Sequence, residues 1–392
     1  MIDRILLFPY TLTLAIRNAL YDKGILKSHK AEVPTICVGN ITVGGTGKTP
    51  HTEMILKTLL RSDRWAYSNI AVLSRGYKRK SKGFQKVSRD GAAATYGDEP
   101  LQIAKKFPSV TVAVDKDRIE GCHFLCNPEE LQTSKKAKKC ADKNVPKSDI
   151  IVLDDAFQYR KLKADVNVIL VDYNRPIHKD KLLPLGQLRD LPKRIRQADI
   201  VIVTKCPPYL DEWEKGKWSK YLGFSSYSTS TCKGKDEKGH ERTLLFSHIG
   251  YRPMKQVYEE ADQRFIYAKR LVLFTGIAKD GPLINYLSDK YKLVKRMKFP
   301  DHHKYSYNDL KSIMRAVGAN PTAVVATTEK DAQRIVDTKK VPGSLKERLF
   351  QVPIEVSFLS NEETAIFEET LLELISSRGS RSGHERIPHE SR

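Results

Sequence analysis

The stretch VGNITVGGTGKTP, residues 38–50, decides how the rest of this sequence is read. An apolar run, TICVG at residues 35–39, comes before it, and a helical pattern, KTPHTEMILKTLL, begins at Lys48. A strand, a glycine-rich loop and a helix N-terminus in this order form a phosphate-binding site, because backbone N–H groups and the helix dipole both stabilise anionic oxygens. The alternative is an ordinary glycine-rich turn.

The loop departs from the strict phosphate-loop pattern at one position, because Thr42 stands where the pattern has glycine. We expect Gly44 and Gly45 to adopt the unusual backbone angles instead. Lys48 is predicted to reach the β- and γ-phosphates and to be catalytic, and the Thr49 hydroxyl is predicted to bind Mg²⁺. The predicted nucleotide-binding residues are Gly44, Gly45, Thr46, Gly47, Lys48 and Thr49.

A loop of this kind also needs an acidic residue at the end of another strand, where it can hold the metal. The stretch DIIVLDDAFQ, residues 149–158, runs directly from an apolar strand into Asp154 and Asp155. Carboxylates at that position bind Mg²⁺ directly or through water. The two aspartates are therefore the predicted metal ligands, and the alternative is that they only cap the end of a strand.

Short apolar, β-branched runs alternate with helical patterns along the first half of the chain. Strands are predicted at residues 35–39, 69–76, 110–115, 149–155, 167–172 and 199–205. Runs as uniformly apolar as these are typical of buried parallel strands. The predicted fold class is α/β: a doubly wound, mainly parallel sheet like that of P-loop NTPases, with a second, smaller α/β domain.

The regular alternation of apolar runs and helical patterns ends at about residue 210. More widely spaced apolar runs follow at residues 270–277, 291–299, 322–332 and 349–359. We therefore expect a core domain at 29–212 and a smaller domain at 213–378. A closing helix is predicted at 361–377, and residues 379–392 are predicted to be a disordered tail. The Lys-rich stretch at 133–148 has no apolar period and is predicted to be a solvated insertion.

The N-terminal segment, residues 1–28, is the only one that hints at lipid. Its apolar run from Ile5 to Ile16 contains Pro9 and is shorter than the ~20 residues that a membrane-spanning helix needs. From Thr11 onward, apolar and charged residues mix as in an amphipathic helix at a membrane surface. Contact with a membrane and packing on its own domain are equally consistent with this pattern.

The chain is strongly basic and has scattered cysteines. Its 392 residues include 68 Lys and Arg against 47 Asp and Glu, a formal net charge of +21. Such a surface attracts polyanions, phosphorylated substrates or an anionic membrane, and charge alone does not choose among them. The six cysteines have no second pair at a metal-ligand spacing, so we expect reduced thiols rather than disulfides or a zinc site.

Several further stretches place charged residues at strand ends or in loops, where sites on α/β folds collect. With the motifs above, SRGY, GDEP, LLPLGQLR, DHH and TTEKDA occur in one order along nearly the whole chain. In this ordered set the sequence resembles the tetraacyldisaccharide 4'-kinase family. The resemblance implies ATP- and Mg²⁺-dependent phosphorylation of the 4'-hydroxyl of a tetraacylated glucosamine disaccharide 1-phosphate. It also implies peripheral association with the cytoplasmic face of the inner membrane in a Gram-negative-type bacterium.

The resemblance assigns the proton-transfer roles. A sugar hydroxyl is a poor nucleophile, so a general base with an orienting partner is needed. The family's aspartate in GDEP and histidine in the DH segment correspond here to Asp98 and His302. Taken alone, Asp98 reads as a helix N-cap and His302 as a surface imidazole. A cleft between two domains can bring such distant residues together.

Acceptor or nucleotide phosphates need cationic contacts, and arginine offers a fixed fork to phosphate oxygens. The predicted substrate-binding residues are Arg75, Arg118, Gln158 and Arg189. For each arginine the alternative is a surface ion pair. The family usually has Gly, His and Glu where this chain has Ala156, Tyr159 and Asp190, which concerns the details of the acceptor pocket.

Two other classes of protein share some of these features. A P-loop metallochaperone or regulatory NTPase would use the same loop, but Pro207 stands where a guanine-reading motif needs aspartate. A nucleic-acid-binding ATPase would suit the positive charge, but no aromatic-interleaved basic strand or helicase-like motif series is present. We therefore expect a lipid disaccharide as partner, no nucleic acid, and a monomer.

Overall fold

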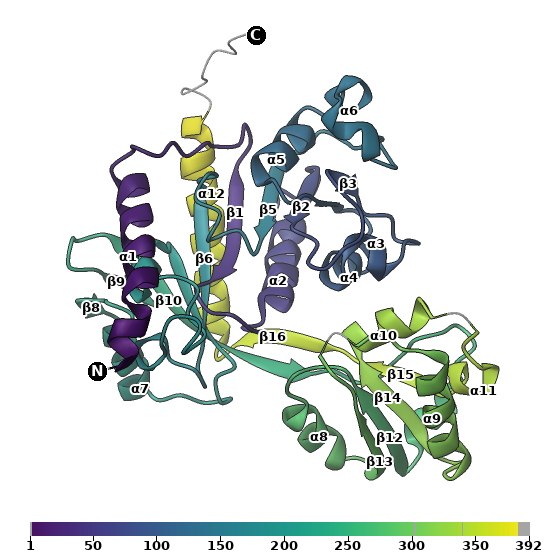
Figure 1. The fold of residues 1–392 in the computed structure, drawn as a ribbon. Coiled ribbons are helices and arrows are strands. Elements are labelled where there is room, and N and C mark those ends of the chain that lie inside the picture. The colour runs from purple at the N-terminus through teal and green to yellow at the C-terminus, as the bar shows by residue number, and fades with distance from the viewer. Residues whose placement is uncertain (1, 302, 339, 383–392) are drawn as a thin grey trace.

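The structure, a computed structural model, describes residues 2–301, 303–338 and 340–382. Figure 1 shows two α/β units, a large one built around a sheet of 11 strands and a smaller one built around a sheet of five. The large sheet has the order β3-β4-β2-β5-β1-β6-β7-β10-β9-β8, and β16 pairs with β10. The predicted α/β class with a second, smaller domain is confirmed.

Six parallel strands form the centre of the large sheet, and each lies within two residues of a predicted one. They are β1 Thr35–Asn40, β2 Ile70–Ser74, β4 Thr111–Val114, β5 Ile150–Asp154, β6 Val166–Asp172 and β7 Ile200–Thr204. Five of them are buried along their whole length or all but one residue, which explains their continuous apolar sequence. The remaining strands of this sheet are β3 Gln85–Lys86, β8 Ser226–Tyr227, β9 Lys233–Lys235, β10 Glu241–Tyr251 and β16 Ile354–Phe358.

Helices cover both faces of the large sheet, so alternate strand residues enter two different cores. In β1, Ile36 and Val38 face one core and Cys37 faces the other. The first core is closed by α2 Lys48–Arg61, α3 Ala93–Tyr96, α4 Asp98–Lys106 and α12 Asn361–Ser382. The second is closed by α1 Ile2–Asp22, α5 Arg118–Cys126, α6 Glu130–Thr133 and α7 Glu212–Tyr221.

The small domain is built entirely from residues between the last two strands of the large sheet. Its sheet has the order β11-β15-β14-β12-β13. The strands are β11 Lys255–Gln256, β12 Arg270–Thr275, β13 Lys292–Lys298, β14 Val324–Thr328 and β15 Leu349–Val352. The helices are α8 Gly281–Ser288, α9 Tyr307–Gly318, α10 Glu329–Val336 and α11 Gly343–Lys346.

This arrangement corrects the expected division at residue 213. β10 pairs with β7 in the large sheet, and the apolar run at 349–359 is two strands rather than one. Pro353 has no N–H to donate and separates β15, in the small sheet, from β16, which is antiparallel to β10. The chain therefore crosses between the domains along the adjacent strands β10 and β16, as Figure 1 shows.

The ends of the chain also differ from expectation. Helix α1 begins at Ile2, includes Pro9, and is not limited to residues after Thr11. No helix in the described part of the chain is both long and apolar enough to cross a membrane. Helix α12 extends to Ser382, into the stretch predicted to be disordered, and residues 383–392 lie outside the described residues.

Two other expectations concern single features of the core domain. All six cysteines are buried and free of disulfides, as predicted. The Lys-rich stretch at 133–148 is less solvated than expected, because Ala137, Cys140 and Val145 are buried in the core beside α5 and α6. Its lysines stay outside, and three small apolar residues anchor the segment.

Candidate active site

The glycine-rich loop between β1 and α2 has a positive φ at two of its glycines, one of which differs from the prediction. Gly44 and Gly47 have φ values of 108° and 86°, whereas Gly45 does not have a positive φ. The positive φ of Gly47 favours glycine there, whereas a Cβ would be tight mainly against the end of the Ile249 side chain, at 3.0 Å from Cδ1. The unusual angles are thus carried by Gly44 and Gly47 rather than by Gly44 and Gly45.

Side chains from neighbouring elements hold the loop's carbonyl groups. The Thr204 hydroxyl of β7 donates to the Thr46 carbonyl over 2.9 Å. His51 Nδ1 lies 2.7 Å from the Gly47 carbonyl, and its Nε2 lies 2.9 Å from Ser247 Oγ on β10. A carbonyl only accepts, so Nδ1 carries the proton. Burial lowers the pKa of His51 to about 4, so the ring stays neutral.

Lys48, at the start of α2, faces the end of β5. Its Nζ lies 3.7 Å from Asp155 Oδ1. Asp155 has a φ of 49°, a left-handed conformation that costs energy for a non-glycine residue and directs its carboxylate toward the loop. Burial alone would raise the pKa of Asp155, but Lys48 and Arg189 lower it below its ordinary value. Asp155 is therefore an ionised carboxylate next to the loop lysine.

Asp154 has a different environment. Its Oδ2 accepts a hydrogen bond from the Ser74 hydroxyl over 3.1 Å, and its Oδ1 is buried without a hydrogen-bond partner among the described residues. Burial, together with the neighbouring Glu99 and Asp155, raises the pKa of Asp154 to about 7. A buried carboxylate oxygen without a partner is costly unless a ligand completes it. Asp154 thus has an oxygen suited to a cation.

Asn40, the last residue of β1, connects the loop to the predicted substrate-binding residues. Its amide donates to Thr46 Oγ1 over 2.8 Å, and its side-chain oxygen accepts from Arg189. Its backbone carbonyl accepts from the Gln158 amide. Arg189 also donates to Asp155 Oδ1 over 3.0 Å. Asn40 therefore brings Gln158 and Arg189 to the loop.

Among the described residues, the other two predicted arginines, Arg75 and Arg118, do not hydrogen-bond to Asn40 or Asp155 as Arg189 does. Arg75 is exposed after β2. Arg118 is buried, and donates to the backbone carbonyls of Asp115 over 2.6 Å and of Asp154 over 3.3 Å. It therefore connects the ends of β4 and β5 through their backbone carbonyls.

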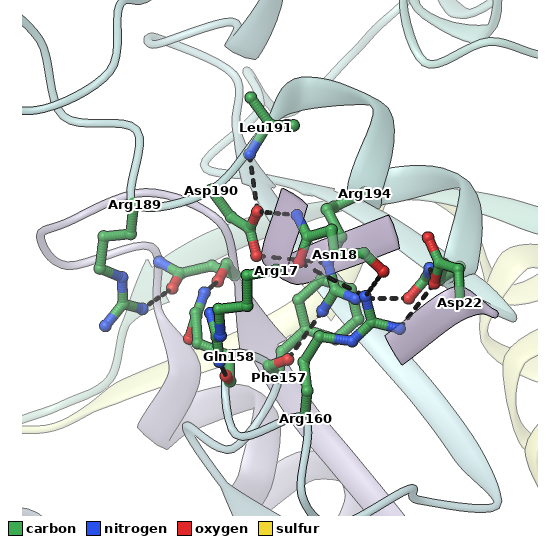
Figure 2. Close-up of polar contacts among 12 residues, drawn as sticks. Arg17, Asn18, Asp22, Phe157, Gln158, Arg160, Arg189, Asp190, Leu191 and Arg194 are labelled. Carbon is green, nitrogen blue, oxygen red and sulfur yellow. Dashed lines mark hydrogen bonds and ion pairs between the residues drawn. The ribbon is translucent and has the colours of Figure 1, made fainter. Parts of the chain in front are cut away.

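Helix α1 contacts the same site from its buried side, as Figure 2 shows. Arg17 donates to the Gln158 carbonyl over 2.9 Å, and Asn18 donates to Asp190 Oδ1 over 2.8 Å. Asp190 also lies 3.3 Å from Arg194, with both side chains almost completely buried. The helix is thus tied to both loops that carry predicted substrate contacts.

The GDEP segment lies at the interface with the small domain. Asp98 is the first residue of α4 and does not cap it; its Oδ2 instead accepts hydrogen bonds from Arg334 of α10. A Cβ on Gly97 would lie 3.3 Å from Gly76 Cα, so GDEP and SRGY are in backbone contact. His302 lies outside the described residues.

Comparison with known proteins decides the family. A family model described as Tetraacyldisaccharide-1-P 4'-kinase matches residues 4–376. The chain belongs to this family. The kinase activity expected from the sequence is confirmed with it.

Relatives named tetraacyldisaccharide 4'-kinase support the family assignment over most of their length. The Phocaeicola vulgatus protein is 36% identical over 354 residues, 89% of this chain and 88% of its own. The Flavobacterium johnsoniae protein is 36% identical over 379 residues, 95% of this chain and 97% of its own. A crystal structure of the "apo" form of LpxK from Aquifex aeolicus in complex with ATP has a TM-score of 0.65 at 26% identity, covering 95% of this chain and 99% of that one.

The structure shows the contacts of the three residues at which this 4'-kinase differs from the usual family residues. The Tyr159 hydroxyl donates to Asp117 over 2.9 Å, and Asp117 caps the start of α5. Ala156 is buried beside the loop strand. Asp190 points away from the loop, toward Asn18 and Arg194. All three changes are therefore accommodated beside the site.

Sequence reasoning missed four residues that the structure places at or next to the candidate site: Asn40, His51, Glu99 and Arg334. Asn40 had a usable signal, because a polar residue that ends a buried strand just before the loop is well placed for a site. Glu99 stood beside the predicted base in GDEP. His51 and Arg334 lie within helical patterns and had no comparable signal.

Proposed function

We propose that the chain transfers the γ-phosphate of ATP to the 4'-hydroxyl of a tetraacylated glucosamine disaccharide 1-phosphate at the loop between β1 and α2. The observation that carries this proposal is the distance of 3.7 Å between Lys48 Nζ and Asp155 Oδ1. The two groups lie beside a glycine-rich loop whose Thr46 and Gly47 carbonyls are held by hydrogen bonds. The lysine supplies the cation that phosphate oxygens need, and the carboxylate supplies the charge that Mg²⁺ needs. ATP is also the ligand named for the Aquifex aeolicus structure.

The residues at the loop fit a magnesium ion. Thr49 together with Asp154 and Asp155 would hold it, and the unpartnered Asp154 Oδ1 supports this assignment. Within the described residues no group of three or more His, Cys, Asp or Glu side chains could hold a metal alone. That agrees with Mg²⁺, which usually binds one or two carboxylates and completes its shell with water and phosphate. When bound, the ion would neutralise charge on the transferred phosphoryl group.

The proton of the acceptor hydroxyl needs a base, and we assign this role to Asp98 acting with His302. Gly276 connects the described part of the DHH loop to Asp98, because a Cβ on Gly276 would lie 3.3 Å from both His303 Cβ and the Pro300 carbonyl. The Gly276 carbonyl in turn accepts a hydrogen bond of 3.0 Å from Arg334, which binds Asp98. A chain of contacts thus supports the approach of the two segments.

For the acceptor, Gln158 and Arg189 lie at the loop, and Arg75 is exposed at the neighbouring strand end. The Arg189 guanidinium also binds Asp155 and Asn40, so it would reach an acceptor phosphate by exchanging one of these contacts. Guanidinium groups bind phosphate bidentately, which suits an acceptor that carries a 1-phosphate. Arg118 is assigned a supporting role, because backbone carbonyls occupy its guanidinium.

We also propose that α1 lies on the cytoplasmic face of the inner membrane. Phe8, Leu12 and Ile16 form an exposed apolar stripe at four-residue spacing, with 63%, 45% and 52% of each residue exposed. The opposite side, which includes Leu14 and Asn18, is buried on the core domain. Membrane contact and packing on the domain thus use different sides of one helix.

The test is acceptor-dependent turnover. Purified protein in detergent micelles should consume ATP in proportion to added tetraacyldisaccharide 1-phosphate and produce the 4'-phosphorylated lipid. GTP in place of ATP and a disaccharide already phosphorylated at the 4'-position are the controls. Nucleotide hydrolysis that does not depend on the acceptor would favour the regulatory NTPase instead.

A further inference from the structure

Helix α10 of the small domain, which carries the last four residues of the TTEKDA motif, lies against α4 of the core domain (Figure 1). Its contacts with that domain repeat at helical spacing. Lys330 Nζ lies 2.6 Å from Glu99, Gln333 accepts from Lys105 over 2.7 Å, and Asp337 accepts from the Ala93 backbone N–H over 2.6 Å. One face of α10 therefore meets the GDEP region through polar groups.

Arg334 is at the centre of this face. Its Nε and Nη2 donate to the same oxygen, Asp98 Oδ2, over 2.9 and 2.7 Å. The arginine side chain is 5% exposed and the aspartate 19%. Two charge-assisted hydrogen bonds to one partly buried oxygen restrict the rotation of the carboxylate more than a single contact does.

Contacts within the small domain hold the Arg334 side chain in the orientation in which it binds Asp98. Its Nη1 donates to Asp331 Oδ1 over 2.9 Å and to the Gly276 carbonyl over 3.0 Å. Asp331 is completely buried and accepts from the Gly276 N–H and the Thr328 hydroxyl through its other oxygen. The guanidinium is thus pre-oriented by its own domain, at little entropic cost to the contact across the interface.

We propose that Arg334 is a positioning residue for phosphoryl transfer, which reaches across from the small domain to orient the carboxylate of Asp98. The inference rests on the proposed function, because it acquires a role in the reaction only if Asp98 is the base. Arg334 acts through Asp98, to which it donates two hydrogen bonds. It makes the orientation of the base depend on the approach of the small domain to the core.

Other charges that face Asp98 must be considered before a pH profile is interpreted. Lys330 and Asp337 both lie near Asp98. Burial lowers the pKa of Lys330 and the charge of Asp98 raises it, whereas burial, the larger cause, and the charge of Asp98 both raise the pKa of Asp337. Both residues are unchanged in the variants below. Loss of the arginine removes a cation next to a carboxylate, which raises the pKa of that carboxylate.

The experiment compares Arg334→Gln and Arg334→Lys with Gln333→Ala, which removes an interdomain contact on the same helix face without touching Asp98. Initial rates are measured in micelles against ATP and tetraacyldisaccharide 1-phosphate over pH 5–9. We expect Arg334→Gln to lower kcat at least about tenfold while KM for ATP stays within about twofold. The acidic limb of its kcat–pH profile should move to higher pH. Arg334→Lys should recover part of kcat and keep the limb near its original position. Gln333→Ala should stay within about twofold of the parent.

Two results would overturn the inference: kcat of Arg334→Gln within about twofold of the parent, or an equal loss in Gln333→Ala. If Arg334→Gln fails to fold, Arg334→Lys decides the question through its kcat and pH limb. In an Asp98→Asn background, Arg334→Gln should cause no further loss, and a fully multiplicative loss would contradict positioning through Asp98. A parent protein without acceptor-dependent activity would instead refute the proposed function itself.

Discussion

The Asn18 amide donates to Asp190 Oδ1 over 2.8 Å, and only 2% of Asn18 and 0% of Asp190 are exposed. Asp190 follows Arg189, which binds the Asp155 carboxylate. A helix with an apolar outer stripe is therefore linked, through one buried hydrogen bond, to the loop next to the predicted metal ligand. Figure 2 shows the Asn18–Asp190 hydrogen bond with Arg189 next to it.

This contact predicts the effect of a change that adds charge without volume. Asn18→Asp places a second carboxylate against Asp190 and removes the donor, so we expect the free energy of unfolding to fall by about 1–3 kcal/mol. Asn18→Ala should cost less, because it removes the donor without adding a charge. Urea denaturation at pH 7 measures both. A smaller loss in the aspartate variant than in the alanine variant would contradict the pairing.

Membrane association should depend on the outer stripe of α1. The double change Leu12→Gln and Ile16→Gln removes exposed apolar surface without affecting the buried side, so the protein should shift from the vesicle pellet to the supernatant. Thr13→Gln is the matched control, since Thr13 is exposed on the same helix but outside the stripe. If the double variant still pellets like the control, the basic surface is the anchor instead.

Much of the fold could be predicted because its signals are local. The six central strands are continuous apolar runs, and burial on both faces explains them. The domain division could not be predicted in the same way, since it depends on β10 and β16 pairing across more than a hundred residues. Pro353 was the one local sign that the run at 349–359 was two strands.

In the candidate site, too, the residues with local signals could be predicted and their distant partners could not. Lys48, Asp154 and Asp155 were predicted because a strand end and a glycine loop position them. The partner of Asp98 could not be found, because Arg334 is 236 residues away and belongs to an ordinary amphipathic pattern. Partners of motif residues are set by domain packing, which a single sequence does not reveal.

Lys48 should be needed for turnover but not for folding. Its side chain is 14% exposed and faces Asp155, so Lys48→Ala removes electrostatic stabilisation of the transferred phosphate and should lower kcat ~10²-fold or more. Lys57→Ala, on the same helix but paired with Glu355, should keep near-normal turnover. Thermal unfolding should be cooperative in both variants. A folded Lys48→Ala protein with normal turnover would refute the role of the loop.

The last prediction concerns pH and a buried acid beside the site. Asp115 follows β4 and is 2% exposed; its Oδ1 accepts from the Asp117 N–H over 3.0 Å, and its Oδ2 has no hydrogen-bond partner among the described residues. Burial raises the pKa of Asp115 from 3.8 to about 6. The folded protein thus retains this proton at pH values where the unfolded chain has lost it. The stability that the neutral acid contributes is therefore lost as pH rises from about 4 through 6.

Asp115→Asn should remove this dependence, because the amide keeps an acceptor for the Asp117 N–H and does not ionise. We expect the variant to gain about 1–3 kcal/mol in free energy of unfolding at pH 8, and progressively less toward pH 5. The control is Asp63→Asn, a change at an exposed aspartate that should leave the pH profile unaltered. Denaturant titrations between pH 5 and 8 measure the difference. An advantage of Asp115→Asn that does not change with pH would show that the gain comes from packing, not from the ionisation of Asp115.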